Sequence, residues 1–200
     1  YKCFFCDRKG IETGFQLKNI DLLVKEIERH SAGGVHAFWF CGAAINIDED
    51  HIRNLCEEII KRNIKVKWSG PLIPSTLRKS TYNLLHMAGC IHLKIGVETV
   101  NQDTLISLGK SITLRSIENC LKCSQGANIK NTITFMVGLP RERELDVVKK
   151  MAFIKKHKGL INSVKVFIFQ VRIGAPIYQS AREFGLEIRP TKSGDQRYIE

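Results

Sequence analysis

The sequence predicts an α/β fold built on a parallel β-sheet. Short apolar runs alternate with amphipathic segments along most of the 200 residues, and this alternation is typical of β-α units joined by right-handed crossovers. A hydrophobic content of 44% and a charged content of 26% are ordinary for one globular domain of this length. Polar residues and glycines follow several of the apolar runs. Parallel folds place their functional residues at that edge, so we expect the site at the carboxyl ends of the strands.

The first β-α units are clear in the hydrophobic pattern. Residues 19–32 carry apolar side chains at helical spacing and stop at a Gly-Gly pair, which predicts a helix. The continuous apolar run VHAFWF at 35–40 predicts a buried strand. Residues 48–63 predict the most regular helix, because acidic residues begin it and basic residues end it. The run IKVKW at 64–68 predicts the next strand, with Ser69-Gly70 following it as polar exit residues.

The same alternation continues through the rest of the chain. Thr113 precedes one amphipathic segment as a side-chain cap, and glycines end two of the helices. Five strands in total fit either an open doubly wound sheet or part of a barrel. No G-x-G-x-x-G follows the first strand, which disfavours a dinucleotide-binding sheet. We expect further strands at 91–97, 131–138 and 163–169, and further helices at 76–88, 114–125, 143–157 and 176–185.

Cys3 and Cys6 form a C-x-x-C pair close to the start of the sequence. Such a pair can be half of a zinc site, a redox dithiol or part of an iron–sulfur loop. A thioredoxin-type dithiol usually opens a helix after a strand, and the sequence before Cys3 shows no such strand. We therefore favour a metal centre at this pair, with the zinc and dithiol alternatives left open.

The other cysteines are predicted to be structural. Cys120 and Cys123 form a second C-x-x-C pair, but within a predicted helix and without further ligands, so we expect them to pack. Cys41, Cys56, Cys90 and Cys120 lie in apolar segments, as buried free thiols do. This usage predicts a reducing, cytoplasmic location, and no apolar run approaches the length of about 20 residues that a membrane span needs.

The formal net charge of +11 is high for this length. Basic residues concentrate in KKMAFIKKHK at 149–158, where they alternate with the apolar face of a predicted helix. One interpretation is a solvated helix surface, and the other is a nucleic-acid or other polyanionic partner. Charge alone does not decide between them.

Segments spread over the chain resemble the radical S-adenosylmethionine (SAM) enzymes. Cys3 and Cys6 match the second and third cysteines of the family signature C-x-x-x-C-x-x-C, whose first cysteine would lie two places before Tyr1. The resemblance therefore implies a chain truncated within that motif. Further segments similar to family motifs, in the same order, are KVKWSG…MAGCIHLKIGVET (65–99), KIGVETVNQDTLISLGKSIT (94–113), TFMVGLPRERELD (134–146) and VRIGAPIYQSAREFGL (171–186).

The resemblance implies a fold and its limits. The fold expected is a partial (β/α)6 TIM-like barrel whose first strand is missing from the given residues. Residues 1–186 would form this core, and residues 187–200 a polar tail or the start of a following segment. The predicted strand that ends in Trp68 and the A-G-C sequence at 88–90 are most similar to the cobalamin-associated subgroup of the family.

The resemblance also implies cofactors and site residues. A [4Fe–4S] cluster and SAM are expected, and cobalamin is a further candidate that a domain outside these residues would bind. Cys3 and Cys6 would be metal ligands. The residues expected to contact SAM are Phe5, Gly42, Glu98, Met136 and Gly138. No catalytic residue is assigned.

The function implied is reductive cleavage of SAM to a 5′-deoxyadenosyl radical, for methyl transfer or radical rearrangement on an unidentified small-molecule, peptide or RNA substrate. An electron donor such as a flavodoxin or ferredoxin would be a partner, and no membrane is expected. Two alternatives stay open: a transfer-RNA-modifying enzyme of the methylthiotransferase type, and a non-enzymatic zinc-stabilised or RNA-binding module.

One departure from the family pattern lies in the turn after residues 131–138. Arg141 stands where the family motif G-L-P-G-E has glycine. Glycine at such a position usually supplies a backbone conformation that other residues avoid. We therefore expect either a remodelled turn or a cation introduced into the site.

Overall fold

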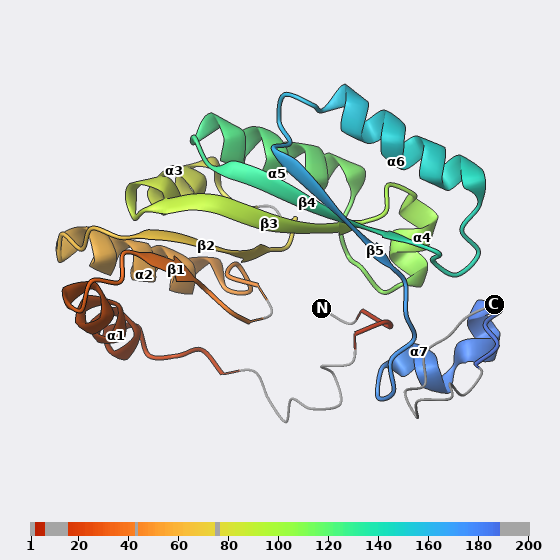
Figure 1. Cartoon of the computed structure of the whole chain (residues 1–200), viewed down its shortest axis with the longest axis horizontal. Helices are drawn as coiled ribbons and strands as arrows, with labels where there is room; N and C mark the ends of the chain where they lie inside the picture. The colour runs from red at the N-terminus through yellow and green to blue at the C-terminus, as the bar shows by residue number, and fades with distance from the viewer. Residues whose placement is uncertain (1–2, 7–15, 43, 75–76, 189–200) are drawn as a thin grey trace.

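The computed structural model describes residues 3–6, 16–42, 44–74 and 77–188 (Figure 1). Five strands form one sheet in the order β1-β2-β3-β4-β5, and every neighbouring pair is parallel. This confirms the predicted α/β fold with a parallel sheet. The strands are β1 (Ala37–Trp39), β2 (Lys67–Leu72), β3 (Cys90–Glu98), β4 (Lys130–Val137) and β5 (Ser163–Ile168).

Helices connect the strands and begin close to where the sequence places them. Thr113 caps α5 by accepting a hydrogen bond from the Ser116 amide at 3.1 Å, as predicted. Asp48 caps α2 in the same way through the His51 amide. The helices are α1 (Ile20–Ala32), α2 (Glu49–Lys61), α3 (Lys79–Met87), α4 (Gln102–Ser107), α5 (Leu114–Gly126), α6 (Glu144–Lys156) and α7 (Pro176–Gln179), followed by the 3-10 helix η2 (Ala181–Phe184).

Three elements differ from the sequence prediction. The run at 35–40 was expected to be a buried strand, but β1 covers only Ala37–Trp39 and both of these residues are exposed, because β1 is at the edge of the sheet. The strand expected at 64–68 is β2, which runs through Ser69, Gly70 and Pro71, so these residues lie within the sheet and not at its exit. A Cβ on Gly70 would come within 2.7 Å of the Ile45 side chain, so glycine serves close packing there and not a turn. Helix α4 was not predicted, because six residues are too few to show a helical period.

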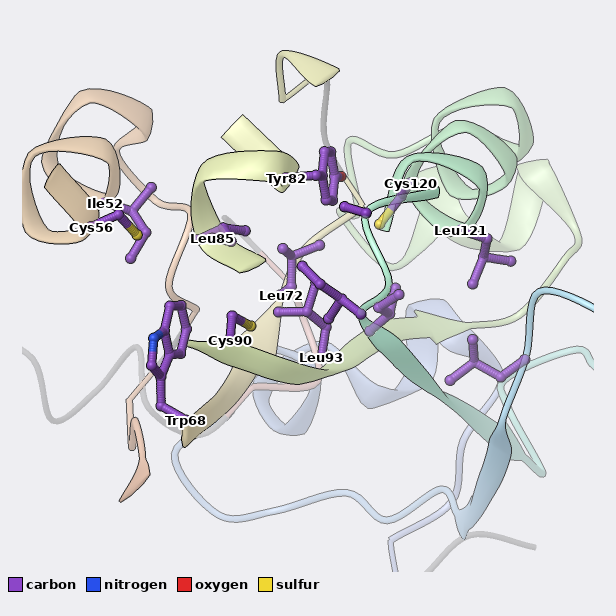
Figure 2. Close-up of a cluster of buried hydrophobic side chains, with 14 of the residues drawn as sticks. Ile52, Cys56, Trp68, Leu72, Tyr82, Leu85, Cys90, Leu93, Cys120 and Leu121 are labelled. Carbon is purple, nitrogen blue, oxygen red and sulfur yellow. The ribbon is translucent and has the colours of Figure 1, made fainter. Parts of the chain in front are cut away.

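A large hydrophobic core lies between one face of the sheet and the helices. Helix α3 packs on β3, and α5 packs on β4. Figure 2 shows that Trp68 and Cys90 from the sheet and Cys56, Tyr82 and Cys120 from the helices point into this space. Cys56, Cys90 and Cys120 are buried as predicted, whereas Cys41 is exposed because it follows β1, where the chain leaves the edge of the sheet. All seven cysteines are free thiols.

A second, smaller core lies at the carboxyl ends of the strands. It joins the end of α4, the turn after β4 and the segment that follows β5. Phe5 and Met136 pack against it, and so does Ile188 at the end of the described residues. Residues 189–200 of the predicted tail lie outside the described part of the chain. The buried members of the second core are Leu108, Leu139, Phe169, Val171, Ala175, Ile177, Ala181 and Leu186.

The two faces of the sheet differ in composition. Leu93, Ile95, Ile133 and Phe135 are buried on the face toward the helices. Residues that alternate with them, such as Lys94 and Thr132, point to the opposite face because side chains alternate along a strand. No helix in the described part of the chain has the length and apolar character needed to cross a bilayer.

Candidate functional site

Cys3 and Cys6 lie in one tight turn that two other elements hold in place. The Cys6 amide donates to the Cys3 carbonyl oxygen at 3.2 Å and closes the turn. The Phe4 amide donates to the Leu108 carbonyl oxygen at 2.9 Å, and the Phe4 carbonyl oxygen accepts from the Ile177 amide at 2.8 Å. The turn is therefore anchored to the ends of α4 and α7. Figure 1 shows it near the carboxyl end of β5 and close to α7.

The two phenylalanines of the turn anchor it through apolar contacts. The Phe4 ring lies 5.9 Å, centroid to centroid, from the ring of Phe184 in η2. Phe5 packs against the second core, as does Met136 from the end of β4. The structure thus brings together Phe5 and Met136, which the sequence analysis assigned to SAM. Their contact with SAM stays a prediction.

Glu98 ends β3 at a buried and irregular position. Its φ is +67°, and the pairing of β3 with β4 shifts between Gly96 and Glu98. The Glu98 carboxylate accepts from Lys110 Nζ at 3.0 Å, and Thr134 Oγ1 donates to it at 3.4 Å. A non-glycine residue held in this region of the backbone map costs about 1–3 kcal/mol and often marks a functional position. The backbone of Glu98, a residue that the sequence analysis assigned to the SAM site, is therefore strained.

Lys110 is a buried cation that the sequence analysis did not assign. Its side chain is 7% exposed, and Nζ also donates to the Gly96 carbonyl oxygen at 2.7 Å. Its neighbours in sequence Leu105, Leu108 and Ile112 are all buried. The available signal was a lysine between Leu108 and Ile112, twelve positions after Glu98.

The Cys3 thiol lies in the same electrostatic environment as this ion pair. Burial raises the pKa of Cys3, the positive charge of Lys110 lowers it, and the negative charges of Cys6 and Glu98 raise it. The two cysteines, Glu98 and Lys110 are therefore close enough to influence one another. Burial outweighs the lysine, so the pKa of Cys3 is raised overall, and a metal that binds this thiol would have to displace its proton.

A second buried ion pair holds the exit of β4. Gly138 has a φ of +76°, and its amide donates to Glu142 Oε2 at 2.7 Å. Glu142 is paired with Lys150, which also donates to the Met136 carbonyl oxygen. The Lys150 and Glu142 side chains are 3% and 5% exposed. This pair fixes the backbone of Met136 and Gly138. The sequence analysis missed it because Glu142 looked like an ordinary charged residue before a helix and Lys150 like an ordinary charged residue within it.

Arg141 corrects the expectation for the turn that follows. The backbone is not remodelled, because Arg141 has a φ of +60°, the region that glycine adopts easily. Nor is a free cation added to the turn, because Arg141 Nη2 donates to the Glu183 carbonyl oxygen at 2.9 Å and so caps η2. Arg141 therefore ties the turn after β4 to the segment that supports the cysteine turn.

Gly42 lies apart from these residues. It follows β1, and β2 separates β1 from β3 in the sheet, so Gly42 shares the carboxyl edge with Glu98 without being on a neighbouring strand. A Cβ at Gly42 would meet no atom within 4 Å. The structure leaves open space there, and the role of Gly42 stays a prediction.

Two further features concern possible binding sites. Among the described residues, no group of three or more His, Cys, Asp or Glu side chains could hold a metal ion, and the role of the Cys3 and Cys6 pair as metal ligands stays a prediction. A cavity of about 570 Å³ opens at the other edge of the sheet, where Lys65, Met87 and Gly89 contribute to its lining. None of the predicted site residues lines it.

Comparisons with known proteins show the family to which the chain is similar. A family model described as the radical SAM superfamily matches residues 1–154. The anaerobic magnesium-protoporphyrin IX monomethyl ester cyclase of Rubrivivax gelatinosus is 26% identical over 160 residues, which are 76% of this chain and 28% of that protein. The tryptophan 2-C-methyltransferase of Streptomyces laurentii is 32% identical over 117 residues, which are 52% of this chain and 19% of that protein.

A solved structure shares the fold. The radical SAM methyltransferase TsrM of Kitasatospora setae, solved with cobalamin and a [4Fe–4S] cluster bound, matches with a TM-score of 0.82 at 17% identity. The match covers 100% of this chain and 46% of that one. The chain thus spans less than a third of the curated relatives and about half of the solved structure. The likeness confirms the partial barrel of β-α units.

Proposed function

The chain belongs to the radical SAM superfamily, and from this we propose that it is the catalytic core of an enzyme that binds a [4Fe–4S] cluster and SAM and cleaves SAM reductively. The observation that carries the proposal is the anchored turn of Cys3 and Cys6 beside the Glu98–Lys110 pair, at the carboxyl edge of a parallel sheet. Two of the three named relatives, the tryptophan 2-C-methyltransferase and TsrM, are methyltransferases, and they favour methyl transfer as the reaction.

The residues of the turn fit an iron–sulfur cluster. Cysteine thiolates are the ligands that such clusters take from proteins, and the turn presents two of them within four residues. The turn is half-buried and pinned at Phe4 on both its amide and its carbonyl group, so the two sulfurs are held in a fixed loop. The family signature places a third cysteine four positions before Cys3.

The bound cofactors would supply one-electron cleavage of the SAM sulfonium, and the chain's own residues would position them. Lys110 carries a positive charge that can meet the carboxylate of SAM, while the Glu98 carboxylate can accept from its amine. The Glu142–Lys150 pair keeps the Met136 carbonyl group and the Gly138 amide in place for the adenine. Phe5 and the second core would exclude water from the cluster side.

Cobalamin would extend this chemistry to methyl transfer. TsrM was solved with cobalamin bound, and it aligns over the whole of this chain. We propose that a domain outside these residues would hold cobalamin, and that a flavodoxin or ferredoxin would deliver the electrons. The boundary near residue 186 and the cytoplasmic location both stay predictions.

The experiment compares two cysteine variants of the full-length enzyme. Cys3→Ala removes a proposed ligand, while Cys123→Ala removes a half-buried thiol of the helical C-x-x-C pair as a matched control. After anaerobic reconstitution, iron content, 5′-deoxyadenosine release with dithionite and methyl transfer from labelled SAM are measured. We expect all three to fall in Cys3→Ala and to be retained in Cys123→Ala. A Cys3→Ala enzyme with full iron content and full SAM turnover would overturn the ligand assignment.

A further inference from the structure

The face of the sheet opposite the helices carries a group of basic residues. His92 and Lys94 lie on β3, Lys130 on β4 and Lys165 on β5. The strand register pairs His92 with Lys130 and Thr134 with Lys165, and paired residues of neighbouring strands point to the same face. We call Lys94, Lys130, Lys165 and His92 the lysine cluster.

Lys130 and Lys165 lie close enough to His92 to affect its pKa, and His92 Nε2 lies 2.7 Å from Thr132 Oγ1 on the same face. Burial lowers the pKa of His92, and the positive charges of Lys165 and Lys130 lower it further. No carboxylate contributes to this shift. In the described part of the chain, none of the three lysines lies within 4 Å of an acidic group. The cluster therefore has an uncompensated positive charge.

The cluster is accessible and has an aromatic side. Lys130 and Lys165 are exposed, and Lys94 and His92 are partly exposed. Lys94 Nζ lies 5.4 Å from the centroid of the Phe167 ring, which is 43% exposed on β5. A lysine placed over an aromatic ring is held in position for a ligand without losing its charge.

The same face leads to the proposed SAM site. Thr134, which is opposite Lys165 in the register, donates to the Glu98 carboxylate. Lys94 precedes Glu98 by four residues on β3, a distance of about 13 Å along a strand. A molecule bound by the cluster would therefore extend along the sheet toward Glu98 and the cysteine turn.

We propose that the lysine cluster binds a carboxylate or phosphate group of the enzyme's substrate, which makes the substrate anionic. The proposal rests on the proposed function, since it assigns the face beside the SAM site to the substrate. Lysines without an acidic partner on one face of a sheet raise the local concentration of anions and fix their orientation by charge-assisted hydrogen bonds. Carboxylate and phosphate share this chemistry, and the experiment distinguishes them.

The test measures binding of two probes to the full-length enzyme by calorimetry, with and without SAM. Benzene-1,3,5-tricarboxylate represents a carboxylate ligand and pyrophosphate a phosphate ligand, with neutral 1,3,5-tris(hydroxymethyl)benzene as the control. The double variant Lys94→Met/Lys165→Met is compared with Lys122→Met/Lys155→Met, which removes two charges from exposed positions of α5 and α6. We expect the first double variant to weaken anion binding by about tenfold or more, and the second by less than about twofold.

The outcomes separate the two proposals. Preference for one probe identifies the anionic group, and equal binding of both supports the shared chemistry. Iron content and SAM cleavage, measured on the same samples, report on the proposed function alone. The anionic-substrate proposal is overturned if the native enzyme binds neither anion, if the neutral control binds equally well, or if both double variants lose the same affinity.

Discussion

The two hydrophobic cores of this chain have different tasks. The larger core contains most of the buried side chains of α1–α6 and joins them to one face of the sheet. The smaller core contains only eight buried residues and supports Phe5 of the cysteine turn. The first determines whether the chain folds, and the second determines where the thiols are held. Stability and cofactor placement can therefore be altered separately.

The largest difference is expected between two isoleucines with the same burial. Ile117 lies in the larger core and Ile177 in the smaller one, and both are 0% exposed. Ile117→Ala should lower the free energy of unfolding by about 2–5 kcal/mol, measured by urea denaturation. Ile177→Ala should lower it less, but should increase amide exchange at Phe4 and alkylation of Cys3, because the turn opens locally. Equal losses in both variants would mean that the two cores form one cooperative unit.

The buried Glu98–Lys110 pair offers the next comparison. Lys110→Met leaves the Glu98 carboxylate buried without its cation, which should cost about 3 kcal/mol of unfolding free energy. The matched control is Lys156→Met, which breaks a pair with Glu118 in which the lysine side chain is 70% exposed. The control should cost less than about 1 kcal/mol. Similar denaturation midpoints for the two variants would show that burial does not make the Glu98–Lys110 pair more important for stability than the exposed Lys156–Glu118 pair.

Asp146 connects two helices, and its removal tests how much this connection contributes to stability. Its carboxylate accepts from Asn101 Nδ2 at 2.8 Å and from the Arg143 amide at 3.1 Å, and so it ties the start of α6 to the start of α4. Asp146→Ala should cost about 1–2 kcal/mol at neutral pH. The hydrogen bond from Asn101 and the Arg143 amide lower the pKa of Asp146, so its contribution is present above about pH 4.

That contribution should be lost as the pH falls through the depressed pKa of Asp146, because the folded state then has to take up the proton. Thermal unfolding of the native chain and of Asp146→Ala, measured over the acid range, should therefore converge. A difference in Tm that stays constant below pH 4 would contradict the assignment.

Arg141 is expected to give the smallest effect. Arg141→Gly relieves a left-handed backbone by about 1 kcal/mol but loses the hydrogen bond to the Glu183 carbonyl oxygen, a similar amount. The Tm should change little, while amide exchange in η2 should increase because Arg141 no longer caps it. A large fall in Tm would show that the hydrogen bond from Arg141 to the Glu183 carbonyl oxygen stabilises the fold by more than the left-handed backbone of Arg141 destabilises it.

The sequence predicted the elements that have a clear period or a clear family motif. Helix α2 and strands β3 to β5 appear close to their predicted bounds, because their apolar residues repeat over several turns or strand positions. The prediction failed at β2, since Gly70 and Pro71 are typical of turns and only the packing of Ile45 explains the glycine.

The candidate site was predicted less completely than the fold. The positions of Glu98 and Gly138 at the ends of strands indicated these two residues. Position could not indicate Lys110, which pairs with Glu98, or Lys150, which pairs with the Glu142 side chain that binds the Gly138 amide. Lys110 follows the unpredicted α4 and pairs with Glu98 twelve positions earlier, and Lys150, from the second turn of α6, pairs with Glu142 eight positions earlier. Both pairs connect residues of different elements, so the period of a single helix or strand does not mark them.

The main-chain bond between Phe4 and Ile177 has a consequence for how the protein is made. The ribosome synthesises residue 4 long before residue 177, and the thiol loop is held at its amide by residue 108 and at its carbonyl group by residue 177. The loop is therefore fixed only when the last β-α unit has emerged and docked. If the proposed cluster forms on this loop, iron and sulfide delivered earlier would meet an unanchored loop, and insertion would follow translation of the barrel.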